Sequence, residues 1–163
     1  MNIEERINKT LLSIATELQM IDSEFYVIGA SAMILSGIKI GETSDIDILT
    51  TEVNASKLQH SLKVYMEIAP ETKENDLFHS NFARFNLPLM DIEVMGNLQI
   101  RKNGVWQSVW VQEYREVSIG EIIVRIPTIE EQKRILSLFG REKDLKRLQM
   151  LERHSLDALS QNK

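Results

Sequence analysis

Apolar residues recur at helical spacing along the first twenty positions of the chain. The positions that share one helical face are Ile3, Ile7, Leu11, Ile14, Leu18 and Ile21. Charged residues lie between them, and this pattern predicts one amphipathic helix over residues 3–21. A continuous apolar run then predicts a buried strand over residues 25–28 that ends in a tight turn at Gly29. A short helix is expected from about Ser31 to Leu35.

Two later segments place acidic residues inside apolar strands. Asp45 and Asp47 are two residues apart, so on a strand both carboxylates point to the same face. Like charges that close together are costly unless a cation lies between them, and oxygen ligands select a hard ion such as Mg²⁺. Asp91 lies in a further apolar strand and is the candidate third carboxylate, with Glu93 on its face. The alternative is an edge strand whose Asp91 and Glu93 face water.

The remaining pattern predicts a mixture of strands and helices. Asn54 is a candidate helix cap, Asn103-Gly104 is a hairpin turn signal, and Thr128 with Glu131 forms a candidate capping box. Gly140 is expected to end the helix that follows this box. The expected elements are strands over 46–49, 82–86, 89–95, 98–100, 105–111 and 122–126, helices over about 55–67, 128–138 and 143–159, and an exposed loop over 71–76.

Length and composition narrow the class of protein. A chain of 163 residues is expected to form one domain, with a core over about 22–126 and C-terminal helices over about 128–160. The net charge of −5 disfavours a large nucleic-acid surface but leaves nucleic acid open as a partner. No cysteine is present, which excludes disulfides and thiolate zinc sites. Without a signal-peptide core or a run of membrane-span length, we expect a cytoplasmic protein with no membrane partner.

The order of these residues resembles the nucleotidyltransferase superfamily related to DNA polymerase beta. The family pattern is an apolar residue, a glycine, then glycine or serine, an interval, Asp-apolar-Asp, and an Asp on a later strand. The segments 28–31, 44–48 and 89–92 follow it in that order, with Ala30 at a position where glycine is common in the family. The chain is most similar to the small bacterial branch, which includes lincosamide and kanamycin nucleotidyltransferases and nucleotidyltransferase toxins. The resemblance implies an α/β (α+β) fold: a mixed sheet flanked by helices, with a C-terminal helical tail.

The resemblance also implies a reaction. A nucleoside monophosphate would pass from a nucleoside triphosphate such as ATP to an acceptor hydroxyl on a small molecule such as an antibiotic, a tRNA or a protein. Two Mg²⁺ ions would assist, and Asp91 would act as base directly or through its metal. The implied residues are Asp45, Asp47 and Asp91 for catalysis and metal binding, and Gly29, Ala30, Ser31 and Lys143 for nucleotide binding.

Several alternatives stay open at the level of sequence. A catalytically degenerate protein that binds nucleotide, or a partner in a toxin–antitoxin pair, would share these motifs. For Lys143, the local pattern favours a solvated helix position over a functional one. Trp106 and Trp110 alternate with valines, which favours core or homodimer contacts over stacking on a substrate. The acceptor, the nucleoside triphosphate and the roles of Glu93, Arg141 and Lys133 are undetermined.

Overall fold

The computed structural model describes residues 1–161, apart from the side chains of residues 68–73. The helices are α1 Ile3–Ser13, α2 Ala15–Met20, α3 Gly29–Leu35, α4 Glu52–Ser61, the short 3₁₀ helix η1 Lys63–Tyr65, α5 Ile129–Phe139 and α6 Glu142–Gln161. The strands are β1 Phe25–Ile28, β2 Asp45–Thr50, β3 Met66–Glu74, β4 Phe78–Asn86, β5 Asp91–Lys102, β6 Val105–Ser108, β7 Tyr114–Ile119 and β8 Ile122–Pro127. Among these elements, no helix is long and apolar enough to cross a membrane.

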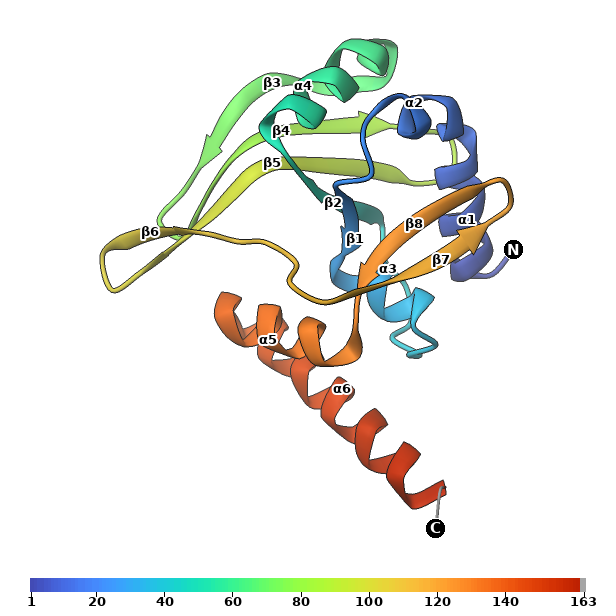
Figure 1. Ribbon diagram of the computed structural model, residues 1–163, viewed down its shortest axis with the longest axis vertical. Helices are drawn as coiled ribbons and strands as arrows, with labels where there is room; N and C mark the ends of the chain where they lie inside the picture. The colour runs from blue at the N-terminus through green and yellow to red at the C-terminus, as the bar shows by residue number, and fades with distance from the viewer. Residues whose placement is uncertain (162–163) are drawn as a thin grey trace.

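The strands form one mixed sheet of eight (Figure 1). Their order is β3-β4-β5-β2-β1-β8-β7, and β6 pairs with β5 outside this path. The β2–β5 and β1–β8 pairs are parallel, whereas β1–β2, β4–β5 and β7–β8 are antiparallel. This arrangement confirms the expected mixed sheet with flanking helices and a C-terminal helical tail.

The larger core lies between the sheet and helices α1, α2 and α4. Ile46 and Ile48 of β2 and Ile92 and Val94 of β5 are all fully buried in it. Because side chains alternate along a strand, the acidic residues between these apolar ones must point to the opposite face of the sheet. The carboxylates of β2 and β5 therefore point away from this core.

Helix α5 covers part of the opposite face, and α6 packs on α5. Ile135 of α5 is buried with Tyr26 and Leu49 in a second cluster. Trp110 packs edge to face on Tyr26 with ring centroids 5.3 Å apart, in keeping with the core role expected from the sequence. Gly140 follows α5 with φ +66°, a left-handed conformation that ends the helix as predicted and lets the chain turn back into α6.

The predicted N-terminal helix is wrong in one respect, because it is divided into α1 and α2 at Ile14. The Thr10 hydroxyl donates to the Arg6 carbonyl at 2.7 Å, and the Ser13 hydroxyl donates to the Thr10 carbonyl at 2.6 Å. Such side-chain bonds compete with the helical ladder near its end. The apolar spacing continues across the break, so periodicity alone does not reveal it.

The region expected as a long helix and a loop is also different. Helix α4 begins earlier, with Thr51 as its cap, and ends at Ser61. Asn54 is instead buried, and its amide donates to Asp22 Oδ1 at 2.7 Å and to Thr50 Oγ1 at 3.1 Å. The expected loop over 71–76 belongs largely to β3, an edge strand paired with β4. Edge strands tolerate charged residues and proline, which is why the composition suggested a loop.

Three further expectations need correction. Strand β7 was not expected, because only one of its residues is buried and no apolar alternation marks it. The strands predicted over 89–95 and 98–100 are one continuous strand, β5. The predicted capping box is half formed: Thr128 Oγ1 accepts from the Glu131 N–H, but the Glu131 carboxylate accepts from the backbone N–H groups of Gln112 and Glu113.

Candidate active site

Parallel pairing of β2 and β5 brings a row of carboxylates together. Asp45 lies opposite Asp91, and Asp47 lies opposite Glu93. All of these side chains are partly exposed, whereas the apolar residues between them are buried. Strand β5 is flanked by β4 and β2, so the edge-strand alternative for Asp91 and Glu93 is wrong. The register thus joins the three aspartates expected from the sequence and adds Glu93 beside them.

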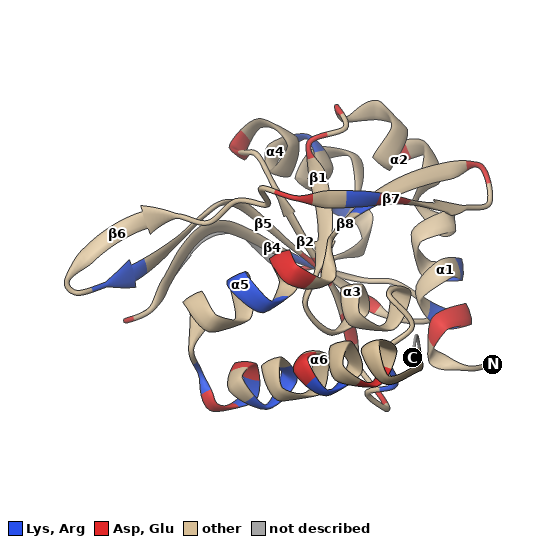
Figure 2. Ribbon diagram, turned by 60° about the horizontal axis from the view of Figure 1, so that its bottom comes forward, with Lys and Arg blue, Asp and Glu red and all other residues tan. Residues whose placement is uncertain are grey.

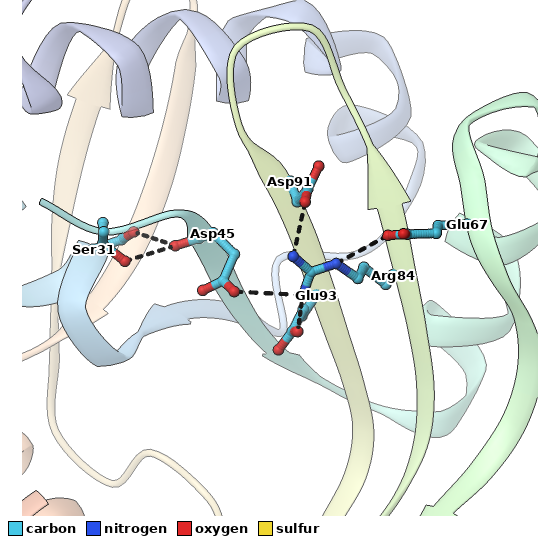
Figure 3. Close-up of polar contacts among 7 residues, drawn as sticks. Ser31, Asp45, Glu67, Arg84, Asp91 and Glu93 are labelled. Carbon is cyan, nitrogen blue, oxygen red and sulfur yellow. Dashed lines mark hydrogen bonds and ion pairs between the residues drawn. The ribbon is translucent and has the colours of Figure 1, made fainter. Parts of the chain in front are cut away.

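Arg84, on β4, lies at the centre of this cluster (Figure 3). Its Nη2 atom is 2.8 Å from Asp91 Oδ2, and its Nη1 atom is 3.5 Å from Asp45 Oδ2 and also hydrogen-bonds Glu93. On the other side, Nε is 3.1 Å from Glu67 Oε2. Burial lowers the pKa of Arg84, but the hydrogen bond with Asp91 and the charges of Glu93 and Asp45 outweigh it and raise the pKa overall.

Sequence reasoning missed Arg84, although a signal was present. The residue is a charge inside the apolar strand predicted over 82–86, which is the same pattern that singled out Asp91. A charged residue in such a strand usually means a solvated face. Its partners depend on the strand order β4-β5-β2, which the local pattern does not contain.

Asp47 is the carboxylate of this row that forms no ion pair with Arg84. Arg84 forms ion pairs with Asp45, Asp91 and Glu93, and Asp47 is not among these partners. Burial, the negative charges of Asp45 and Glu93, and a hydrogen bond with Glu93 raise the pKa of Asp47 to about 7, while the charge of Lys143 opposes this rise. Near neutral pH, a cation at Asp47 would therefore relieve an existing electrostatic cost.

This raised pKa predicts how stability depends on pH in metal-free protein. The folded state holds the Asp47 proton more tightly than the unfolded state does, so ionising Asp47 destabilises the fold as the pH rises from about 4 to about 7. Asparagine mimics the protonated form. Thermal unfolding in a chelator should show Asp47→Asn close to wild type at pH 4 and progressively more stable towards pH 8.

The control for this measurement is Asp157→Asn, which removes an exposed acid from α6. Its difference from wild type should stay nearly constant over the same range. A difference between Asp47→Asn and wild type that does not change with pH would show that the carboxylate cluster imposes no such cost.

Gly29 lies directly beside Asp47, at the turn from β1 into α3. Its φ is +68°, and an added Cβ would lie 2.9 Å from Asp47 Oδ2. A side chain here would therefore meet both a backbone penalty and the carboxylate itself. Ala30 follows and lines the cleft described below. The Ser31 side chain is buried, and its hydroxyl donates to the Asp45 carbonyl at 3.4 Å, which ties the turn to β2 (Figure 3).

A cleft of about 370 Å³ opens over the carboxylates. Asp45, Asp47 and Glu93 line it from the sheet, and Lys143 and Arg147 line it from α6. Figure 2 shows basic residues interspersed with acidic ones along α6. The rest of the wall is largely apolar, formed by residues that include Phe78, Phe82, Met95, Leu98 and Phe139. The cleft thus has an acidic floor, a basic side and an apolar end.

The other candidate residues differ in where they lie relative to the cleft. Asp91 is absent from the lining of the cleft, although it neighbours Asp45. Arg141 lines the cleft, but its Nε is bound to the buried Asp144 at 2.6 Å and its guanidinium stacks 4.9 Å from the Phe78 ring centre. Lys133 pairs with Glu130 on the surface of α5, outside the cleft.

The carboxylate oxygens of this cluster are suitable ligands for a hard divalent cation, although Arg84 already forms ion pairs with some of them. Among the described residues, no three acidic or histidine side chains are arranged to hold a metal ion. Asp45, Asp47 and Glu93 nevertheless offer carboxylate oxygens at the cleft floor, and oxygen is the ligand that Mg²⁺ prefers. The unrelieved charge at Asp47 is the place where a cation gains most.

Comparison with known proteins supports the fold. No protein-family model matches the chain, and no curated protein matches its sequence. Among solved structures, a Thermotoga maritima protein assigned as a nucleotidyltransferase is 20% identical, with a TM-score of 0.76 over 94% of this chain and 96% of that one. Lincomycin-bound LnuA, a lincosamide antibiotic adenylyltransferase, is 15% identical, with a TM-score of 0.56 over 88% and 95%. The antibiotic-resistance factor ANT(2'')-Ia is 10% identical, with a TM-score of 0.56 over 91% and 83%.

These likenesses extend over most of each chain, and they agree with the order of motifs found in the sequence. The chain therefore has the fold of the nucleotidyltransferases.

Proposed function

We propose that the protein is a metal-dependent nucleotidyltransferase. The observation that carries this proposal is the register of β2 and β5, which gathers four carboxylates and brings three of them, Asp45, Asp47 and Glu93, to the lining of one cleft beside the glycine turn. The acceptor oxygen would attack the α-phosphorus of a nucleoside triphosphate, the bond to the leaving phosphate would break, and pyrophosphate would depart. Such transfer depends mainly on positioning and charge neutralisation, which this constellation suits.

We assign the metal ligands to Asp45, Asp47 and Glu93. The sequence pointed to Asp91 as the third ligand, but Asp91 does not line the cleft, and both of its oxygens are engaged. Oδ2 accepts from Arg84, and Oδ1 accepts at 2.9 Å from the Asn86 amide in the orientation that satisfies this amide. Mg²⁺ held at the cleft floor would neutralise phosphate charge and activate the acceptor hydroxyl. The proton of the acceptor hydroxyl would pass to one of the carboxylates that line the cleft.

The triphosphate would lie between the glycine turn and α6. The turn at Gly29 and Ala30 begins α3, where backbone N–H groups lack helical partners. Lys143 and Arg147 supply positive charge across the cleft. The field of Lys143 already reaches Asp47, which supports a place for Lys143 close to the metal and the phosphates.

Removing the Lys143 charge should weaken nucleotide binding specifically. Lys143→Met is expected to raise the Kd for Mg²⁺–ATP about tenfold, which corresponds to about 1.4 kcal/mol. The matched control is Lys146→Met on the same helix, because Lys146 is exposed, pairs with Glu142 and does not line the cleft. Calorimetric titration of both variants measures the difference. Equal affinities for the two variants would mean that Lys143 is only a solvated residue.

The cleft favours a small-molecule acceptor. Its volume of about 370 Å³ falls in the range of small-molecule sites, roughly 300–1,000 Å³. The apolar end suits a hydrophobic portion of such a molecule, and the net charge of −5 disfavours a bulky polyanion. The solved structure of LnuA, which has the same fold, contains bound lincomycin. We therefore place tRNA and protein acceptors second.

One observation favours a second function, a nucleotide-binding protein without catalysis. Arg84 already supplies a positive charge to three of the four carboxylates, so part of the metal's role is filled. Pyrophosphate release separates the two functions. With Mg²⁺, each of the four common nucleoside triphosphates and a low-molecular-weight cell extract, a transferase releases pyrophosphate in proportion to acceptor consumed. A binding protein takes up nucleotide and releases none.

A further inference from the structure

We propose that the Arg84 guanidinium fills one of two cation positions in the carboxylate cluster, so that the protein binds one divalent ion there instead of two. The inference deepens the proposed function and rests on it. The sequence resemblance implied two Mg²⁺ ions, whereas the cluster contains a fixed positive charge that the sequence pattern did not predict.

The contacts of Arg84 are those expected of a bridging cation. It joins Asp45 of β2 to Asp91 and Glu93 of β5, the residues from which a second ion would take its ligands. In two-metal sites the ions lie about 3.5–4 Å apart and share carboxylates. A guanidinium among these oxygens leaves no room for an ion that must bind the same ones. Its charge is also permanent, because arginine does not lose its proton in proteins.

Arg84 is held in place from the side away from the cleft. Glu67 Oε2 lies 3.1 Å from its Nε. In the orientation that satisfies its hydrogen bonds, the Asn86 amide donates to Glu67 Oε2 and to Asp91 Oδ1, each at 2.9 Å, and so joins the two acids that flank Arg84. The Arg84 side chain is only 23% exposed. Its position is therefore set by β3, β4 and β5, not by anything bound in the cleft.

The charge balance leaves room for one more cation on the other side of the cluster. Arg84 forms ion pairs with four carboxylates, including Glu67, and Asp47 is outside this set. Asp47, Asp45 and Glu93 line the cleft, so an ion entering from solvent meets these oxygens first. One divalent ion and one guanidinium would then share the cluster.

Counting bound Mn²⁺ tests the proposal without any nucleotide or turnover. Electron paramagnetic resonance of free Mn²⁺ gives the number of ions bound per chain. We expect one ion in wild type, one in Arg84→Lys, which keeps a charge in place, and two in the neutral variants Arg84→Met and Arg84→Gln. Adding Asp91→Asn to Arg84→Met should return the number to one. The control is Arg101→Met, an exposed arginine on β5, which should bind one ion.

Thermal unfolding is a second, independent test of the role of Arg84. Without metal, the neutral Arg84 variants should melt below wild type, because mutual repulsion among the carboxylates is no longer compensated. Mn²⁺ should raise their melting temperature more than it raises that of wild type or Arg101→Met. Two neutral variants are included so that a failure of one to fold leaves the other.

The result that supports the proposal is one ion in wild type and one more in a folded neutral variant. Two ions in wild type, none in wild type, or no gain in the neutral variants would each overturn it. Because the counts are made without nucleotide, they decide the role of Arg84 even if the protein binds no nucleoside triphosphate. Failure of the proposed function appears separately, as absence of nucleotide binding or of pyrophosphate release.

Discussion

Asp47→Asn is expected to abolish nucleotidyl transfer while the protein stays folded. Asparagine keeps the size of the side chain but removes the charge proposed to hold the metal, at the one carboxylate of the row that Arg84 does not pair with. We expect a loss of at least about a thousandfold in kcat/KM, or about 4 kcal/mol of transition-state stabilisation. The measurement is the rate of α-phosphate transfer, with thermal unfolding recorded on the same sample.

The stability of the variant distinguishes a metal-binding role of Asp47 from a structural role. At neutral pH the metal-free variant should melt at or above wild type, because it no longer holds an ionised carboxylate beside the negative charges of Asp45 and Glu93. The exposed-acid control Asp157→Asn should retain full activity. An Asp47→Asn variant that melts far below wild type would show that the aspartate pair supports the fold and does not form a metal site.

Gly29→Ala is expected to have the next largest effect, on both stability and activity. An alanine at φ +68° costs about 1–2 kcal/mol of backbone strain. Its Cβ would also lie 2.9 Å from Asp47 Oδ2, so this carboxylate has to move. We expect transfer to fall by about a hundredfold, roughly 2.7 kcal/mol in the barrier. Steady-state kinetics and thermal unfolding measure the two effects.

Gly37→Ala is a matched control, because it separates the two penalties. Gly37 has φ +85°, and an added Cβ there meets nothing within 4 Å. It should carry the backbone cost and keep its activity. Equal activity in the two variants would mean that the turn at Gly29 is only a connection between β1 and α3.

The structure also changes the meaning of substitutions at Gly29. If Gly29 only bound nucleotide, as the resemblance implies, a side chain there would crowd the triphosphate and weaken nucleotide binding more than Mg²⁺ binding. The added carbon instead points at Asp47, so Gly29→Val should weaken both. The sequence pointed to Gly29, but the atom that an added side chain would meet follows from the pairing of Ile28 with Asp47.

The acidic strands were predictable because their signal is local. In β2 and β5, a carboxylate alternates with a fully buried apolar residue, and alternation determines the face that each side chain occupies. The local sequence pattern does not distinguish Asp91 from Glu93 as the proposed third metal ligand. It depends on the register of β2 against β5 and on which oxygens Arg84 and Asn86 already engage.

The elements that sequence reasoning missed lie at the two edges of the sheet. Strands β3 and β7 occupy these edges. Most of the β7 residues are exposed, so their pattern does not differ from that of a loop. Edge strands are defined by the neighbour with which they pair, and this pairing is a property of the whole fold.

Tracing the α-phosphate of a nucleoside triphosphate shows whether the protein transfers a nucleoside monophosphate. Wild-type protein and Asp47→Asn would be incubated with Mg²⁺, cell extract and nucleoside triphosphates labelled at either the α- or the γ-phosphate. If the proposed function is correct, wild type transfers the α-label to an acceptor and releases the γ-label as pyrophosphate, and Asp47→Asn does neither. Tight nucleotide binding by wild type with no labelled acceptor and no pyrophosphate would contradict it.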